Sequence, residues 1–149
     1  MEIMIKQLTP ADIDNFKAML QVFENVFEMT GFNTPADAHL KDLLSQPNFL
    51  VFVAIHRGQM IGGLTAHILP SYYRTAPSVY IYDLAIKTEH QRKGFGKMLL
   101  EAVRSHARNS GYADVFVQAE GADTHALDFY RATGGEAQQV VHFTYNINS

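Results

Sequence analysis

The chain has 149 residues, of which 47% are hydrophobic and 18% are charged, and its net charge at pH 7 is −3. This length and composition predict a single folded domain over residues 1–149 and exclude a disordered chain. The negative charge argues against a general nucleic-acid binder, and the absence of cysteine excludes disulfides, thiolate metal sites and cysteine nucleophiles.

The sequence also carries no signal for a membrane or for export. No apolar run approaches the roughly 20 residues that a membrane span needs. The segment Met1–Lys6 is too short and too charged for a signal peptide. We therefore expect a cytoplasmic protein that makes no contact with membranes.

The first elements expected in chain order are a strand and an amphipathic helix. The strand is predicted over Glu2–Leu8. Thr9 is expected to cap the helix, with Pro10 at its first position and Gly31 at its end. The helix is identified by one apolar stripe, formed by Ile13, Phe16, Met19, Leu20, Phe23, Val26 and Phe27.

A second helix and a β-hairpin are expected next. The helix should run from near Thr34 to Pro47. Two β-rich runs, Asn48–His56 and Gln59–Leu69, are separated by the dipeptide Arg57-Gly58. A two-residue separation that contains glycine predicts a tight hairpin turn.

The centre of the chain predicts a strand, a short turn and a helix. A tyrosine-rich loop, Pro70–Pro77, precedes the apolar strand Tyr80–Ile86. The turn Gln91–Gly96 then leads into an amphipathic helix that begins at Lys97 and closes near Asn109.

The C-terminal part predicts a strand, a short helix and a final strand. Asp114–Ala119 is the first of these, and Asp123 or Thr124 should cap a helix that runs through Ala132. Gln138–Ile147 alternates as a last strand. The full order, β-α-α-β-β-β-α-β-α-β, predicts an α/β fold in which helices flank a mixed sheet.

The turn between the central strand and its helix has the features of an anion site. The first N–H groups of a helix are unpaired, and the helix macrodipole favours negative charge there. Gly94 and Gly96 allow close approach of the backbone, while Arg92, Lys93 and Lys97 add positive charge. We interpret this turn as a cradle for a diphosphate.

Two common diphosphate loops do not match this turn. A Walker A loop requires Ser or Thr where Met98 stands, and a dinucleotide-binding fingerprint requires Gly or Ala where Leu99 stands. The residues Gln91, Gly94 and Gly96 instead resemble the acyl-CoA pyrophosphate loop of the GNAT superfamily of N-acetyltransferases.

Further motifs resemble one group within that superfamily, the small aminoglycoside 3-N-acetyltransferases. The resemblance runs from about Leu40 to about Asn146. It implies a GNAT fold with a mixed, mostly antiparallel central sheet, whose central strands splay apart to bind acetyl-CoA. The motifs that carry it are Leu64–Pro70, Tyr80–Ile86, Glu89-His90, Val117–Ala119 and Val141–Phe143.

Two side chains are the candidate catalytic groups. Asp83 interrupts an apolar strand, where an unpaired carboxylate is costly, so it is held either by a structural hydrogen bond or at a cleft for an ammonium substrate. The resemblance supports the second role, with Asp83 as base. It also implies that Tyr130 protonates the departing thiolate, while the alternative for Tyr130 is ordinary aromatic packing.

The resemblance assigns the cofactor site to backbone and loop. In the GNAT fold, backbone groups of Leu84, Ala85 and Ile86 would bind the pantetheine amides and polarise the thioester carbonyl. The pyrophosphate would lie on the loop and the helix start, formed by Gln91, Arg92, Lys93, Gly94, Phe95, Gly96 and Lys97.

Further acidic residues are candidates for binding a cationic acceptor. Glu24 and Glu28 are expected one turn apart on the first helix, and Glu120 and Asp123 flank a glycine turn. Each is equally well explained as a solvated charge, or as a helix cap for Asp123. The small aminoglycoside enzymes carry a more acidic tract than this chain does at the positions that follow Ala119. Tyr72 is a further candidate at the acceptor cleft.

No metal site is expected, because the seven histidines form no HxH or HExxH pattern.

The chain is interpreted as an acetyl-CoA-dependent N-acetyltransferase that modifies an aminoglycoside, at its 3-amino group by resemblance, and so confers resistance. The alternatives are a polyamine, another small amine or a peptide N-terminus as acceptor, or an acyl-CoA sensor without catalysis. The alternating final strand also suggests pairing across a homodimer.

Overall fold

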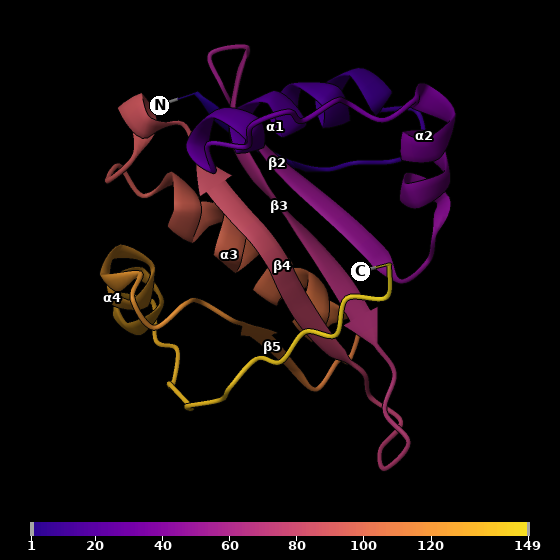
Figure 1. Ribbon diagram of the computed structural model, residues 1–149, viewed down its shortest axis with the longest axis vertical. Helices are drawn as coiled ribbons and strands as arrows, with labels where there is room; N and C mark the ends of the chain where they lie inside the picture. Colours follow the sequence, from indigo (N-terminus) through magenta and orange to yellow (C-terminus); the bar gives the residue numbers. More distant parts are fainter. Residues whose placement is uncertain (1, 149) are drawn as a thin grey trace. The chain divides into compact units, whose positions relative to one another are not determined.

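The computed structural model describes residues 2–148, which belong to two compact units, residues 1–118 and 119–149. The first unit is built on a five-stranded sheet whose strands follow in sequence order (Figure 1). Four strands are antiparallel, and the fifth joins the fourth in parallel, so the predicted α/β class with a mostly antiparallel mixed sheet is confirmed. The strands are β1 (Ile3–Gln7), β2 (Phe49–His56), β3 (Gln59–Leu69), β4 (Ser78–Ile86) and β5 (Asp114–Val117).

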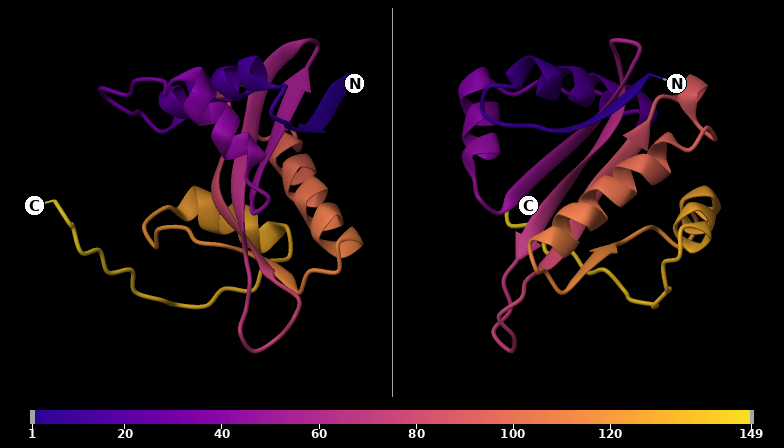
Figure 2. Two further views of the ribbon diagram at one scale, coloured as in Figure 1. Left: turned by 90° about the vertical axis from the view of Figure 1, so that its right-hand side faces the viewer. Right: turned by 180° about the vertical axis from the view of Figure 1, so that it is seen from behind.

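Helices cover both faces of this sheet. Helices α1 (Ile13–Val26) and α2 (Asp37–Ser45) lie on one face, and α3 (Phe95–Asn109) lies on the other (Figure 2). Burial of each large apolar side chain contributes about 1.5–3 kcal/mol, so these helix faces fix the layers. The buried helical residues are Phe16, Met19, Val22 and Phe23 of α1, Leu40 and Leu44 of α2, and Phe95, Leu99, Leu100, Val103 and Ala107 of α3.

The predicted hairpin between β2 and β3 is confirmed. Arg57 and Gly58 both have positive φ, 50° and 77°, as a two-residue turn of the primed type requires. His56 lies opposite Gln59, so the strands pair right up to the turn.

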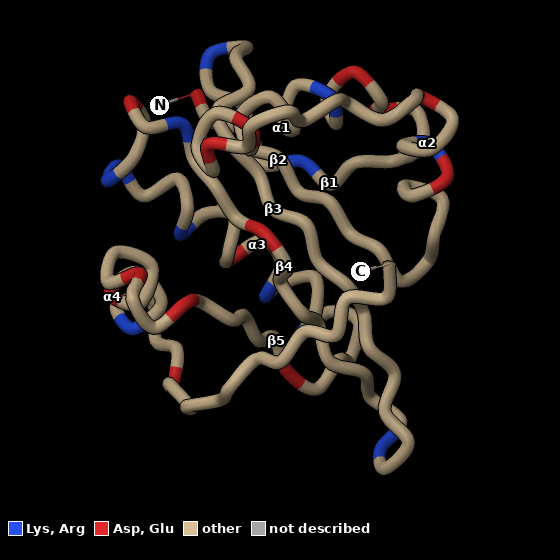
Figure 3. Tube along the Cα trace, viewed as in Figure 1, with Lys and Arg blue, Asp and Glu red and all other residues tan. Residues whose placement is uncertain are grey.

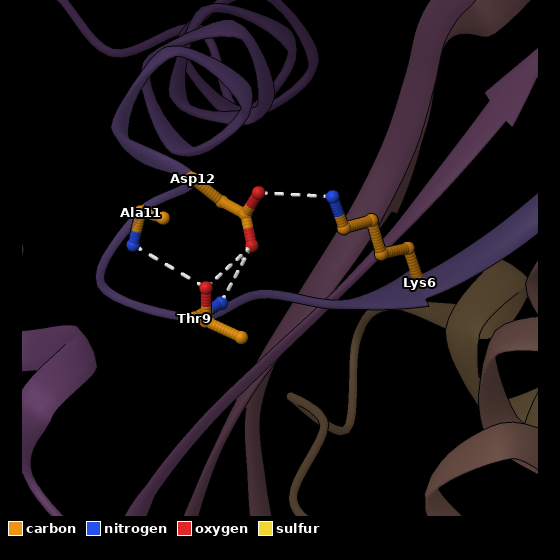
Figure 4. Close-up of polar contacts among 4 residues, drawn as sticks. All are labelled: Lys6, Thr9, Ala11 and Asp12. Carbon is orange, nitrogen blue, oxygen red and sulfur yellow. Dashed lines mark hydrogen bonds and ion pairs between the residues drawn. The ribbon is translucent and has the colours of Figure 1, made fainter.

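The start of α1 differs from the prediction, because Thr9 does not cap the helix. The helix begins at Ile13, and the Asp12 carboxylate instead accepts hydrogen bonds from the Thr9 amide (2.7 Å) and hydroxyl (3.1 Å) (Figure 4). Lys6 Nζ lies 2.9 Å from the same carboxylate. This local bonding holds residues 9–12 in a turn and delays the helix.

The connection between α1 and α2 is longer than predicted. Helix α1 ends at Val26 instead of Gly31, and Glu28 lies beyond it with a φ of 53°. That left-handed conformation cannot continue a right-handed helix. Helix α2 then begins at Asp37 instead of near Thr34.

The second unit contains helix α4 (Thr124–Ala132), whose predicted cap is confirmed. Asp123 accepts a hydrogen bond of 3.0 Å from the Ala126 amide. The predicted strand Gln138–Ile147 is wrong, since the described part of this unit forms no strand. A strand requires a neighbouring strand to complete its ladder, and this unit supplies none.

Candidate active site

The central strands β4 and β5 stop pairing partway along β4, at the candidate site. They pair from Ser78 opposite Asp114 to Ile81 opposite Val117, after which β5 ends while β4 continues to Ile86. Among the described residues, this last part of β4 therefore has a ladder partner only on the β3 side. The predicted splay of the central strands is confirmed, although β5 ends two residues before the predicted Ala119.

A β-bulge in β4 lies beside this parting. Thr65 lies opposite Asp83 and Ala66 lies opposite Ile81, which leaves Tyr82 as the extra residue. Bulges re-aim side chains and are frequent next to active sites. Sequence reasoning missed the bulge at Tyr82, since neither alternation nor a glycine marks this position.

Asp83 carries an unusual carboxylate for a strand of this sheet. It is half-buried, and among residues 2–148 its side chain accepts no hydrogen bond. Burial raises the pKa of Asp83 above its ordinary value, and the charge of His67 partly opposes this effect. The structural alternative, a carboxylate tied into a hydrogen bond, is therefore not observed.

The turn after β4 is anchored to the strand and contains residues in the left-handed conformation. It passes through a short 3-10 helix, Thr88–His90, and the Gln91 side-chain amide then donates to the Ile86 carbonyl at 2.9 Å. Arg92 and Gly94 both have positive φ, 62° and 87°, a conformation that recurs in anion-binding backbone turns. Helix α3 follows directly, and its N-cap residue, Gly94, has no side chain that could cap the first turn.

Positive charge gathers along this turn. Figure 3 shows basic residues on the segment between β4 and α3, and Arg92, Lys93 and Lys97 are all exposed there. Phe95 differs from its neighbours, because its ring is buried 5.2 Å from His56 and 6.2 Å from His90. Its side chain thus anchors the start of α3, and only its backbone is available to a ligand.

The second unit carries three of the sequence-predicted site residues. Tyr130 lies on α4, with its ring 5.1 Å from Phe129, and its carbonyl accepts a hydrogen bond of 2.9 Å from the Gly135 amide. Glu120 is exposed, and the Asp123 carboxylate is engaged as the cap of α4. The helix-cap explanation for Asp123 therefore holds.

The remaining acceptor candidates belong to the first unit. Glu24 is partly buried on α1, near the end that packs over the C-terminal half of β4, where Ala85 joins the α1 core cluster (Figure 1). Glu28 lies outside the helix, so the two are not one helical turn apart. Tyr72 is almost fully exposed in the loop after β3, with its ring 5.3 Å from Tyr73.

Two classes of feature are not found in residues 2–148. No group of three or more His, Cys, Asp or Glu side chains is arranged to hold a metal ion. None of the helices there is long and apolar enough to cross a membrane.

Comparison with known proteins identifies a matching family and similar sequences. Residues 16–134 match the acetyltransferase (GNAT) family. The chain is 24% identical over 102 residues to N-acetyltransferase family 8 member 3 of Mus musculus, covering 68% of this chain and 45% of that protein. It is also 24% identical over 123 residues to N-acetyltransferase 8 of Homo sapiens, covering 73% and 54%. The chain thus spans about half the length of these relatives.

Solved structures include a much closer match. An aminoglycoside acetyltransferase, meta-AAC0020, from an uncultured soil metagenomic sample and in complex with sisomicin, is 44% identical, with a TM-score of 0.96 and coverage of 98% of this chain and 97% of that one. The aminoglycoside N-acetyltransferase AAC(6')-Iy in complex with CoA is 21% identical, with a TM-score of 0.79 and coverage of 98% and 95%, and so shares the fold. The predicted GNAT fold is confirmed.

Proposed function

This chain belongs to the acetyltransferase (GNAT) family, and from that premise we propose that it is an acetyl-CoA-dependent N-acetyltransferase whose acceptor is an aminoglycoside. One observation carries the choice of acceptor. The chain is 44% identical, over almost its whole length, to an aminoglycoside acetyltransferase in complex with sisomicin.

The residues of the turn after β4 fit the diphosphate of a CoA ligand. Arg92 and Gly94 have the positive φ of an anion-binding nest, and the N-cap of α3, Gly94, has no side chain that could cap the first turn. A Cβ at Gly94 would meet nothing within 4 Å, so the backbone is open on that side. Exposed Lys93 and Lys97 supply further positive charge.

Acetyl-CoA, when bound, supplies the acetyl group as a thioester. Among residues 2–148, β4 has no ladder partner on the β5 side at Leu84–Ile86, and this edge is proposed to offer backbone groups to the pantetheine arm and to the developing oxyanion, except for the Ile86 carbonyl, which already accepts from Gln91. Gln91 acts indirectly, by holding the turn against Ile86. Because the chain has no cysteine, a thioester-linked acetyl-enzyme is excluded, and direct transfer in a ternary complex is the simplest mechanism.

Asp83 is the proposed base. An acceptor ammonium must lose a proton before it can attack, and the half-buried Asp83 carboxylate has no hydrogen bond among residues 2–148 that would occupy it. Its raised pKa makes it a stronger proton acceptor than an ordinary aspartate. Tyr130 Oη is proposed to donate a proton to the departing sulfur, a role that rests on the family resemblance.

Glu24, Glu28, Glu120 and Tyr72 are proposed as peripheral contacts for a polycationic acceptor. We propose the 3-amino group as the acetylation site, and resistance as the consequence. Acetylation removes a positive charge and so weakens attraction to RNA phosphates. Mass spectrometry and NMR of the product would locate the acetyl group, and acetylation at any other amine would overturn the regiochemistry alone.

A homodimer is a further proposal. Large apolar side chains are exposed along the segment after α4, from Val140 (63%) to Ile147 (88%). Pairing with a second copy along this segment would cover these exposed side chains. Light scattering at micromolar concentration should give twice the chain mass, and a monomer mass would exclude the dimer.

The test of the acceptor is free-thiol release from acetyl-CoA. Gentamicin-, kanamycin- and neomycin-type aminoglycosides are compared with spermidine and a panel of peptides. Turnover confined to the aminoglycosides supports the proposal. Turnover confined to spermidine or to peptides would establish one of the alternative acceptors, and binding of acetyl-CoA without any turnover would favour the sensor.

A further inference from the structure

A continuous row of ring side chains crosses the sheet next to Asp83. The rings come from β2, β3, β4 and β5, and each contacts the next. Their centroids are separated by 5.3, 5.7, 5.9 and 4.8 Å, and the last pair is stacked with an interplanar angle of 9°. We call this row the aromatic strip. In order of contact, its members are Phe49, His67, Tyr82, Tyr80 and Phe116.

The strip lies on the sheet face that α1 covers in part. At one end Phe49 packs against Phe16 of α1, with ring centroids 6.4 Å apart. Ala85, two residues after Asp83, belongs to the core cluster beneath the same helix. The strip leaves this cover as it crosses β4, where Tyr82 is 60% exposed.

Several contacts support the open part of the strip. The Tyr80 hydroxyl donates a hydrogen bond of 3.1 Å to the Gln118 side-chain carbonyl. Phe116, stacked on Tyr80, is 38% exposed. Tyr80 and Tyr82 are two residues apart on β4 and so share a face of the strand, where their rings contact each other. A preformed ring surface requires little further ordering when a ligand binds.

The chemistry of this surface selects for cations. Aromatic faces carry negative quadrupole potential and attract ammonium groups, most strongly where water is excluded. Asp83, the residue after Tyr82, adds a formal negative charge that among residues 2–148 is engaged in no hydrogen bond. Exposed rings and an unpaired carboxylate together match a ligand that has apolar ring faces and several ammonium groups.

We propose that the aromatic strip is the platform that binds the acceptor. One cationic ring of the acceptor lies on the face of Tyr82, and the neighbouring ring of the acceptor carries the amine that faces Asp83. This inference rests on the proposed acetyltransferase function and names what selects its substrate. A rigid, ring-borne polyamine covers the strip in one conformation. A linear polyamine must be ordered along it and offers less contact area, so it binds more weakly.

The experiment compares Tyr82→Leu with Tyr82→Phe. Affinity for kanamycin is measured by calorimetry in the presence of CoA, and KM is measured separately for kanamycin and for acetyl-CoA. Removal of the ring in Tyr82→Leu should weaken kanamycin binding about fivefold to thirtyfold and leave KM for acetyl-CoA unchanged. Tyr82→Phe should stay within about threefold of the wild type, because it keeps the ring.

Two further variants keep the test independent of folding. Phe116→Leu on β5 should also weaken kanamycin binding, since it removes the ring stacked on Tyr80. Tyr112→Leu is the matched control, because Tyr112 follows α3 and its ring contacts His106 on the opposite face of the sheet. Circular dichroism and thermal unfolding verify that each variant is folded.

The outcomes separate the platform from the proposed function. Unchanged kanamycin affinity in both Tyr82→Leu and Phe116→Leu, with normal wild-type turnover, would overturn the platform and leave the function standing. Ring-dependent binding in a wild type that acetylates no aminoglycoside would support the platform and overturn the function. Failure of the wild type to bind kanamycin would overturn the platform.

Discussion

Replacing Asp83 by asparagine removes the proposed base while keeping the size of the side chain. The carboxylate is half-buried in β4, and among residues 2–148 it accepts no hydrogen bond. Loss of a positioned general base lowers the rate by about 10²–10⁴-fold, which corresponds to about 2.7–5.4 kcal/mol in the activation free energy. We expect kcat to fall by this factor, with little change in the affinity for acetyl-CoA, which is proposed to bind elsewhere on β4 and on the turn.

Stability should respond to the same substitution in the opposite sense. Because burial raises the pKa of Asp83, the folded protein holds this proton more tightly than the unfolded chain does. The stability that this provides is complete at low pH and is lost as the pH rises through the raised pKa. At neutral pH the charged group is a burden, so Asp83→Asn should be at least as stable as the wild type.

The assays are thiol release between pH 5 and pH 9 and urea unfolding at pH 7. Wild-type kcat/KM should decline as the pH falls through the raised pKa of Asp83, and this acidic limb should be absent from the residual activity of Asp83→Asn. Asp42→Asn, an exposed carboxylate change on α2, is the control and should alter neither property. Turnover of Asp83→Asn equal to that of the wild type would refute the assignment of Asp83 as base.

Three other substitutions test the supporting structure. Gln91→Ala breaks the hydrogen bond to Ile86 and should raise KM for acetyl-CoA about twofold to tenfold, with a smaller effect on the free energy of unfolding. An unchanged KM would contradict the anchoring role. Gly63→Ala places a Cβ against the sulfur of Met19 and the backbone oxygen of Phe52 and should lower the free energy of unfolding, measured in urea, by about 1–3 kcal/mol; wild-type stability would contradict this close packing. Asp12→Asn should be destabilised at neutral pH, because hydrogen bonds, chiefly from Lys6, lower the pKa of Asp12. The urea midpoints of variant and wild type should converge as the pH falls through that lowered pKa. A difference that stays constant with pH would exclude the Asp12 charge as the cause of the destabilisation.

Most of the sheet and the anion turn were predictable because their signals are local. The Arg57-Gly58 hairpin depends on two residues that accept positive φ. The turn before α3 depends on Gly94 and on the apolar stripe of the helix that follows. Each of these features is encoded within a few residues, so reading the sequence locates it.

The features that sequence reasoning missed depend on partners that are distant in the chain or on competing local bonds. The alternation of Gln138–Ile147 signals strand preference, but a strand forms only where another strand pairs with it. Thr9 has the chemistry of a cap, yet the Asp12 carboxylate captures its amide and hydroxyl. The bulge at Tyr82 arises from the register between β3 and β4, which neither strand encodes alone.

The candidate site divides in the same way. The Gly-rich turn and Asp83 were visible in the sequence as a phosphate-binding pattern and a charge in an apolar strand. The aromatic strip was not visible, because Phe49, His67 and Phe116 come together with the β4 tyrosines only through strand pairing. Recognition of the strip therefore required the register of four strands.

The most direct test of the account is acetyl transfer from acetyl-CoA to kanamycin by the purified wild-type protein. Transfer is monitored as free-thiol release, and spermidine is the comparison acceptor. The account predicts rapid turnover with kanamycin, a product heavier by one acetyl group in mass spectrometry, and much slower turnover with spermidine. Turnover with spermidine and none with kanamycin, gentamicin or neomycin would contradict it.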